Sequence, residues 1–191
     1  MMIYQKNKAH TIKENMQDVL TSGALGCMNV NYYAFSTNED FIYKDIDKAY
    51  DDLCNLISKS LKLYRNGTFL SSAETGINQL NSKKYPLNIT KVILYEKEYE
   101  VMKYSVYTSD KDVEITNPIS DKTQYLAATP YSSFKKVTFN TGKESVLTPN
   151  NEIADTLGVY IEVKYPVCLA GREKYAKAEV YVNLNMQQNQ L

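Results

Sequence analysis

Apolar residues in the first third of the chain recur at the 3.6-residue spacing of an α-helix. One stripe runs through about residues 4–28, with charged and polar residues between its members, which are Ile12, Met16, Val19, Leu20 and Cys27. This pattern predicts one amphipathic helix. Gly23 and Gly26 come late in it, where they either permit close packing against a sheet or mark a fraying end. The polar segment 29–40 that follows is predicted to be a loop.

A second apolar stripe predicts a helix over about residues 46–64. Its members are Ile46, Tyr50, Leu53, Ile57 and Leu61. Asp45 or Asp47 can cap its start, because a carboxylate accepts hydrogen bonds from the first backbone amides of a helix. Asn66-Gly67 provides a left-handed end for this helix.

From about residue 88 onward the period changes from that of a helix to that of a strand. Ile89–Glu96 and Glu100–Tyr107 are β-branched and aromatic runs separated by two charged residues, and they predict an antiparallel hairpin. We expect one short strand within 109–130 and another over Phe134–Phe139. Segment 148–155 has the composition of a loop.

The clearest alternation lies in the last third of the chain. The apolar face of the first strand comprises Val159, Ile161, Val163, Tyr165 and Val167, whereas Tyr160, Glu162 and Lys164 point the other way. A turn over Gly171–Lys174 precedes a partner strand that alternates in the same manner. Its apolar members are Ala178, Val180, Val182 and Leu184.

These elements predict an α+β fold in one domain over residues 1–191. Two N-terminal helices (about 4–28 and 46–64) pack on one face of a mostly antiparallel, meandering sheet (about 88–184). We expect the opposite face of the sheet to be exposed to solvent. A chain of this length can bury about 70% of its extended surface, which is enough for a real core. Residues 186–191 are predicted to be a disordered tail.

The charge composition disfavours nucleic acid as a partner. Lys and Arg number 22 and Asp and Glu number 22, so the formal net charge is zero. Nucleic-acid-binding domains usually carry a basic excess on one face. Nearly all the positive charge is Lys, since Arg65 and Arg172 are the only arginines, and this bias is typical of an AT-rich bacterial coding sequence.

No residue pattern predicts catalysis, a metal or a cofactor. His10 is the only histidine, and its lysine-rich surroundings indicate a solvated helix face. The acidic group Asp45, Asp47, Asp51 and Asp52 is predicted to cap a helix and to be solvated in its first turn. Asp110, Asp112 and Glu114 are interpreted as a hydrophilic loop, with weak Ca²⁺ binding as the alternative. We therefore expect a non-enzymatic protein without catalytic, cofactor-binding or metal-ligating residues.

The three cysteines fit no metal-ligand spacing. Cys27, Cys54 and Cys168 lie far apart in the sequence, and their odd number leaves at least one without a disulfide. Isolated buried thiols are predicted, and one disulfide remains possible if the fold brings a pair together.

Tyrosines are abundant in the strand region: Tyr95, Tyr99, Tyr104, Tyr107, Tyr160, Tyr165, Tyr175 and Tyr181. Several of them must lie on the outer face of the sheet if its inner face holds Val, Ile and Leu. Cross-strand packing is the favoured role. The alternative is an exposed tyrosine-rich surface that contacts protein or carbohydrate.

The start of the chain provides the cue for location. No apolar run is long enough for a secretory signal or a membrane span. The first helix follows Met1-Met2 without a capping residue, which is the pattern expected when an upstream segment has been removed, with a frayed native terminus as the alternative.

This order of elements resembles the pilin-like proteins of the TadE or pseudopilin type. The resemblance depends on the helix at 4–28 with its Leu20–Leu25 segment, the second helix, and the final strand pair Gly158–Val167 and Ala176–Leu184. In that family a hydrophobic helix anchors the protein in the membrane and continues outward as an amphipathic helix that packs on an extracellular sheet. No functional residue of the family is carried over to a numbered position.

The resemblance implies a membrane-anchored structural or assembly component of a bacterial cell-surface or secretion system of pilus type. It would lie on the extracellular side of the cytoplasmic membrane or at the cell surface. Its partners would be other proteins or further copies of itself, with membrane contact through the removed N-terminal helix. The competing interpretation is a soluble α+β ligand-binding or enzymatic domain with a pocket lined by tyrosines.

Overall fold

In the computed structural model, the described part of the chain begins with three helices, and the strands follow them. The helices are α1 (Met2–Cys27), α2 (Tyr32–Asn38) and α3 (Ile46–Ser60). The strands are β1 (Leu63–Asn66), β2 (Phe69–Ser72), β3 (Leu87–Glu98), β4 (Val101–Thr108), β5 (Gln124–Ala127), β6 (Lys135–Asn140), β7 (Val146–Leu147), β8 (Ile153–Ala154), β9 (Gly158–Leu169) and β10 (Arg172–Asn183). The structure describes residues 2–61, 63–66, 69–72, 87–108, 124–127, 135–169 and 172–184, with side chains within 10–61, 87–108, 136–165 and 175–184.

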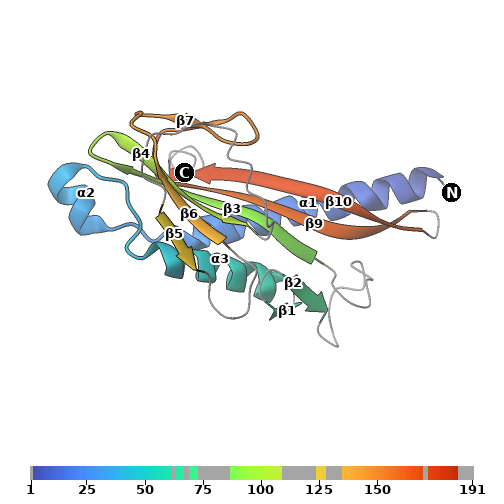
Figure 1. Cartoon of the computed structure of the whole chain (residues 1–191). Helices are drawn as coiled ribbons and strands as arrows, with labels where there is room; N and C mark the ends of the chain where they lie inside the picture. The colour runs from blue at the N-terminus through green and yellow to red at the C-terminus, as the bar shows by residue number, and fades with distance from the viewer. Residues whose placement is uncertain are drawn as a thin grey trace.

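The described strands form one antiparallel sheet and a small separate hairpin (Figure 1). The sheet has eight strands, with the path β1-β2-β3-β4-β6-β5, and the β9–β10 hairpin joins it through β3. β3 pairs with β4 from Lys91 to Glu98 and with β9 at Asn88 and Ile89 near its start. The predicted α+β fold is confirmed, since the helices pack against this antiparallel sheet.

α1 and α3 lie on one face of the sheet and run in opposite directions (Figure 1). The predicted stripe of α1 packs against α3 and the β9–β10 hairpin: Ile12, Met16, Leu20 and Cys27 are at most 8% exposed, and Val19 is partly buried. A Cβ atom on Gly23 would lie 3.0 Å from Ile57 Cγ1, and one on Gly26 would lie 2.8 Å from Leu56 Cδ1. The two glycines therefore allow close packing, against α3 rather than against the sheet.

The opposite face of the sheet carries a second buried cluster, so the expectation that this face is exposed to solvent is wrong. The cluster comprises Ile93, Tyr95, Met102, Val106, Val137, Phe139, Ala154, Tyr160 and Tyr181. The β7–β8 hairpin crosses this face and contributes Ala154 and Val146 (Figure 1). Because successive side chains of a strand point to opposite faces, Leu94 joins the helix-side core and Tyr95 joins this second one.

Two predictions in the helical third are corrected. Segment 29–40 holds α2, whose start is capped by the side chain of Asn31 as it accepts a hydrogen bond from the Ala34 amide. The helix predicted to end near residue 64 ends at Ser60. The residues that follow pair as β1 with β2, because strand pairing supplies partners for their backbone amides and carbonyls.

The strand boundaries differ less from the prediction. β3 and β4 form the expected hairpin, and β5 and β6 are the expected short strands. Segment 148–155 contains β8, and β10 begins at Arg172, inside the predicted turn. The predicted disordered tail at 186–191 lies outside the described residues. None of the helices in the described ranges is long and apolar enough to span a membrane.

Candidate functional site

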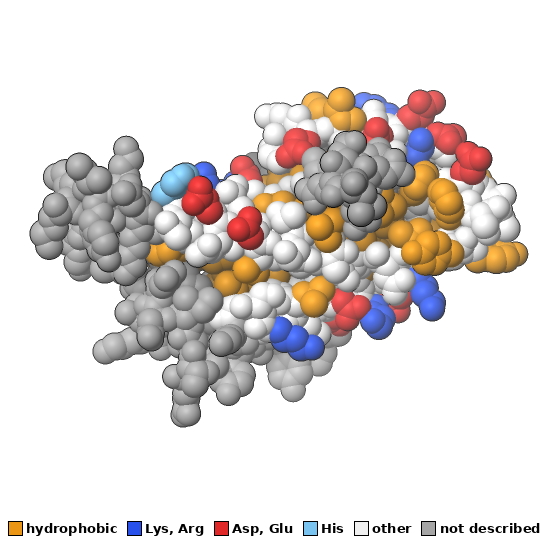
Figure 2. Space-filling model, turned by 180° about the vertical axis from the view of Figure 1, so that it is seen from behind, with side chains coloured by type: hydrophobic (Ala, Val, Ile, Leu, Met, Phe, Trp, Pro, Cys, Tyr) orange, Lys and Arg blue, Asp and Glu red, His pale blue; other side chains and the backbone are white. Residues whose placement is uncertain are grey.

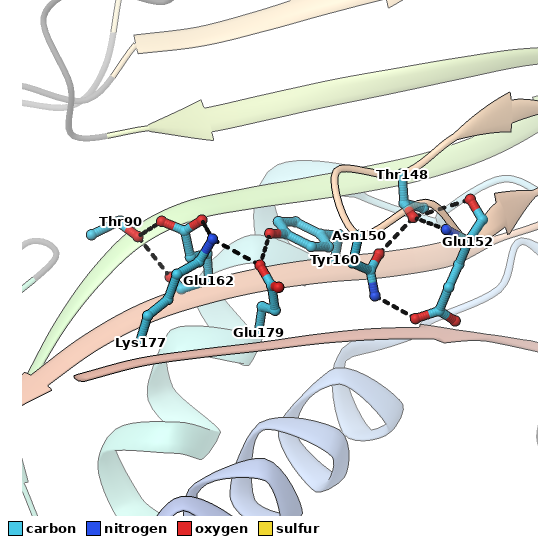
Figure 3. A network of polar contacts seen from close by, with 8 residues as sticks. All are labelled: Thr90, Thr148, Asn150, Glu152, Tyr160, Glu162, Lys177 and Glu179. Atoms are coloured by element: carbon cyan, nitrogen blue, oxygen red, sulfur yellow. Dashed lines mark hydrogen bonds and ion pairs between the residues drawn. The ribbon is translucent and has the colours of Figure 1, made fainter.

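A cluster of charged side chains lies on the β7–β8 side of the β9–β10 hairpin (Figure 3). Glu162 on β9 is paired directly opposite Glu179 on β10, and two carboxylates in such positions repel each other. The Lys177 ammonium relieves this repulsion, since its Nζ lies 2.7 Å from Glu162 Oε2 and 2.8 Å from Glu179 Oε2. Two hydroxyls complete the cluster: Thr90 donates to Glu162 Oε1 at 2.6 Å, and Tyr160 donates to Glu179 Oε2 at 2.8 Å.

These contacts shift the pKa values of all three charged groups in the Glu162–Lys177–Glu179 cluster. Burial raises the pKa of Glu162, but hydrogen bonds from Lys177 and Thr90 outweigh it and hold that pKa below its ordinary value. Hydrogen bonds from Lys177 and Tyr160 lower the pKa of Glu179, and hydrogen bonds to both carboxylates raise the pKa of Lys177. General acid–base catalysis works best with a pKa near the operating pH, so the shifts move each group away from that role at neutral pH. The geometry favours a structural clasp.

A turn next to this cluster holds its own polar groups (Figure 3). The Thr148 hydroxyl lies 2.6 Å from Asn150 Oδ1 and accepts a hydrogen bond from the Glu152 amide at 2.9 Å. Asn150 Nδ2 donates to Glu152 Oε1, and Asn151 takes the left-handed conformation with φ of 64°. These contacts shape the β7–β8 hairpin that covers the second core.

A second polar cluster joins α3 to the sheet. Asp47 Oδ1 accepts a hydrogen bond from the Tyr107 hydroxyl at 2.7 Å and lies 2.5 Å from Lys136 Nζ. The Lys136 side chain is only 9% exposed, whereas that of Asp47 is 64% exposed. The Tyr107 ring stacks on Tyr50 with a centroid distance of 4.2 Å. Burial by itself raises the pKa of Asp47. The hydrogen bonds from Lys136 and Tyr107 together have the larger, opposite effect, so the pKa of Asp47 lies below its ordinary value.

Exposed aromatic side chains gather at one end of the molecule. They are Tyr32, Tyr33 and Phe35 of α2, together with Tyr99 in the β3–β4 turn, with exposures of 75%, 79%, 42% and 71%. No residue of α2 is buried. The Tyr99 amide donates to Asp40 Oδ1 at 2.7 Å, which holds the turn beside the end of α2. We call these four residues the aromatic tip, and Figure 2 shows hydrophobic side chains at this end of the molecule.

The predicted acidic group divides into separate roles. Asp45 caps α3 by accepting the Lys48 amide at 2.9 Å, and Asp52 pairs with Lys48 at 2.6 Å. Asp47 is not merely solvated, because it pairs with Lys136. Among the described residues, no group of acidic, His or Cys side chains could hold a metal ion. Asp110, Asp112 and Glu114 lie outside the described residues.

His10 lies where the sequence predicts, on an exposed face of α1. Its Nε2 atom is 3.2 Å from Glu14 Oε1, one helical turn away. Sequence reasoning missed Tyr107 and Lys136 as partners of Asp47, which are 60 and 89 residues distant. No local signal in the sequence marks such a contact.

Most of the strand tyrosines are buried, which corrects the idea of an exposed tyrosine-rich sheet. The residues below 9% exposure are Tyr95, Tyr107, Tyr160, Tyr165 and Tyr181. Tyr99 and Tyr175 are exposed, and Tyr104 is half-buried. Tyr95 contacts Tyr181 edge-on with a centroid distance of 5.7 Å, so these rings pack against one another across strands.

Comparisons with protein-family models, with curated proteins and with solved structures gave no match for this chain.

Proposed function

We propose that this protein is a non-enzymatic structural or assembly component of a bacterial cell-surface or secretion system of pilus type. The chain would be the extracytoplasmic part of a membrane-anchored protein, with the anchor preceding α1. Its partners would be other proteins of the assembly or further copies of the same chain. The observation that carries this proposal is that the N-terminal end of α1 and the aromatic tip lie at opposite ends of an elongated molecule (Figure 1).

The position of α1 supports an attachment at one end. This helix has 26 residues and runs along the sheet beside β9 and β10, with its N-terminal end at the same end of the molecule as the end of β9 (Figure 1). Its buried stripe, from Ile12 to Cys27, joins it firmly to α3 and to the hairpin. A helix held in this way transmits a pull at its N-terminal end directly to the core of the domain.

The aromatic tip supports a protein contact at the other end. α2 has no buried residue, so its aromatic side chains contribute little to the core. Tyr and Phe are enriched at protein interfaces, since they supply large contact area at a small cost in side-chain entropy. Tyr33, at 79% exposure, is the most exposed of the large hydrophobic side chains described.

The polar clusters support a structural role as well. Ion pairs within the Glu162–Lys177–Glu179 cluster join β9 to β10, and the Asp47–Lys136 ion pair joins α3 to β6. Each charge in them already has its partner within the protein. Such internally satisfied ion pairs are typical of a structural role.

Localisation of the native protein tests the proposal. The native gene product should be expressed in its host, followed by membrane fractionation and N-terminal sequencing of the mature protein. Recovery in the membrane fraction or in sheared surface filaments, with an apolar N-terminal segment of about 20 residues, is expected. A cytoplasmic protein that begins at Met1 or Met2 would contradict the proposal.

A pair of substitutions tests the role of the aromatic tip. Tyr33→Ser should reduce cross-linking of the protein into high-mass assemblies in native membranes. Tyr175→Ser is the matched control, since this tyrosine is 68% exposed and lies on β10, away from the tip. The free energy of unfolding of both variants should lie within about 0.5 kcal/mol of that of the wild type, because exposed side chains contribute little to stability. Equal cross-linking by the two variants would count against the tip as a contact surface.

A further inference from the structure

Two cysteines lie in the core where α1 packs on α3. Cys27 ends α1 and Cys54 lies within α3, and they are 1% and 0% exposed in the same buried cluster. Both are thiols in the structure. The Lys44 amide donates to the Asn29 carbonyl at 2.8 Å, which joins the chain leaving α1 to the chain entering α3. The two helices therefore form an antiparallel pair (Figure 1).

The glycine contacts set the register of this helix pair. A Cβ atom on Gly23 would lie 3.0 Å from Ile57 Cγ1 and 3.4 Å from Leu53 Cδ1. One turn forward from Gly23 is Cys27, and one turn back from Ile57 is Cys54. Because the helices run in opposite directions, these two steps lead the same way in space and bring Cys27 near Cys54, in the same buried cluster. The pKa of Cys27 agrees with this placement, since burial and then the Cys54 thiol raise it to about 12.

We propose that Cys27 and Cys54 form an intramolecular disulfide when the chain folds in an oxidising compartment, which ties the end of α1 to α3. A disulfide requires Cα atoms about 5.5–6 Å apart. Facing Cα atoms of two packed helices come about this close, because the axes are about 8–10 Å apart and each Cα lies about 2.3 Å from its own axis. Ile57 and Leu56 of α3 pack directly onto Gly23 and Gly26, so the two helices are in close contact along this part of α1.

The third cysteine is placed elsewhere. Cys168 lies near the end of β9 and pairs with Glu173, near the start of β10. Figure 1 shows the end of β9 and the start of β10 at the same end of the molecule as the N-terminal end of α1, whereas Cys27 is at the C-terminal end of that helix. The fold therefore selects Cys27 and Cys54 among the three possible pairs.

The buried position sets when the bond forms. The thiolate is the attacking species, and a pKa of about 12 leaves almost none of it at Cys27 in the folded protein. Oxidation therefore belongs to folding, before the core closes. One cysteine thiolate attacks a low-molecular-weight disulfide such as oxidised glutathione and releases one glutathione thiolate. The second cysteine then attacks the mixed disulfide and releases the other, so two protein thiols lose two electrons and two protons while one glutathione disulfide becomes two thiols.

Refolding of the full chain carrying Cys168→Ser tests this proposal. The reduced, unfolded chain is refolded with a mixture of oxidised and reduced glutathione, and a second sample is folded under reducing conditions before it meets the same mixture. We expect the first sample to lose 2 Da and both titratable thiols, with a Cys27–Cys54 peptide in the digest. The second sample should keep both thiols. Closing a loop of this size should raise the Tm by about 10 °C relative to the reduced form of the same chain.

The reduced form shows independently that the chain folds, and Cys54→Ala in the Cys168→Ser background is the control that cannot form the bond. A folded chain that keeps two thiols after oxidative refolding would overturn the proposal, as would disulfide-linked dimers or a lower Tm in the oxidised form. In the chain with all three cysteines, a predominant pairing with Cys168 would overturn it as well. The proposal rests on the proposed function only for the compartment. The refolding test is done in vitro, so its failure would leave the localisation result untouched.

Discussion

The contact between Asp47 and Lys136 gives the sharpest test of how the helices are held on the sheet. Lys136 Nζ lies 2.5 Å from Asp47 Oδ1, and the lysine side chain is 9% exposed while that of the aspartate is 64% exposed. A hydrogen bond to a charged group contributes about 1.5–3 kcal/mol, whereas a fully exposed pair contributes about 0.2–1 kcal/mol. With one partner buried and the other largely exposed, we expect a coupling energy of about 1–2 kcal/mol.

A double-mutant cycle of Asp47→Asn and Lys136→Met measures this coupling. Urea unfolding followed by far-UV circular dichroism suits a protein without tryptophan. Asp47 also lies in the first turn of α3, where a carboxylate gains about 0.3–1 kcal/mol from the helix dipole. That contribution is present with or without Lys136 and cancels in the cycle.

Asp52→Asn is the matched control on the same helix. Asp52 pairs with Lys48, whose side chain is 61% exposed, so this substitution should cost no more than about 0.5 kcal/mol. A coupling energy below about 0.3 kcal/mol between Asp47 and Lys136, within the error of additivity, would refute the reasoning. The buried ammonium would then be satisfied by other groups.

Three further changes test other parts of the structure. Leu53→Ala, at a fully buried position between α1 and α3, should lower the free energy of unfolding by about 2–5 kcal/mol in urea titrations, and a cost under about 1 kcal/mol would contradict that packing. Tyr43→Phe removes the buried hydrogen bond of 2.9 Å from the hydroxyl to the Gly158 carbonyl, so we expect a loss of about 1–2 kcal/mol by the same titration, and no change would mean that the bond adds nothing. Glu162→Gln should lower the free energy of unfolding at pH 7, because the pKa of Glu162 is lowered in the folded protein. The extra stability of the wild type is fully present above the unfolded pKa of about 4.3 and is lost as the pH falls through the pKa of the folded protein. Thermal unfolding from pH 7 to pH 3 should show the two proteins converge, and a constant difference would exclude ionisation of this carboxylate as the cause.

The sequence alone determined the elements that bury one regular face. The stripe from Ile12 to Cys27 and the alternation from Val159 to Tyr165 repeat a helical or strand period over many residues, and all but the half-covered Val19 are buried in the structure as predicted. Burial of one face is a local property of the pattern, because a period of 3.6 or 2 places apolar residues on one side whatever they pack against. The α+β class followed from the order of these patterns.

Short elements depended on contacts distant in the sequence. α2 has no apolar stripe of its own, and its hydrogen-bonded turns begin at the Asn31 cap and precede a backbone pairing of Phe41 with Lys97. The helix that ends at Ser60 gives way to β1 because a partner strand is available. Whether these short segments form a helix or a strand therefore depends on the tertiary contacts around them.

Only the tertiary structure decided which surfaces are covered. Tyr160 and Tyr181 alternate with core residues and so were expected on an exposed face, yet the β7–β8 hairpin closes over them. Lys136 finds its carboxylate on α3, 89 residues earlier in the chain. The period of a strand determines which residues share a face. Whether that face is exposed to solvent depends on whether another segment packs over it, and the sequence of the strand does not specify that segment.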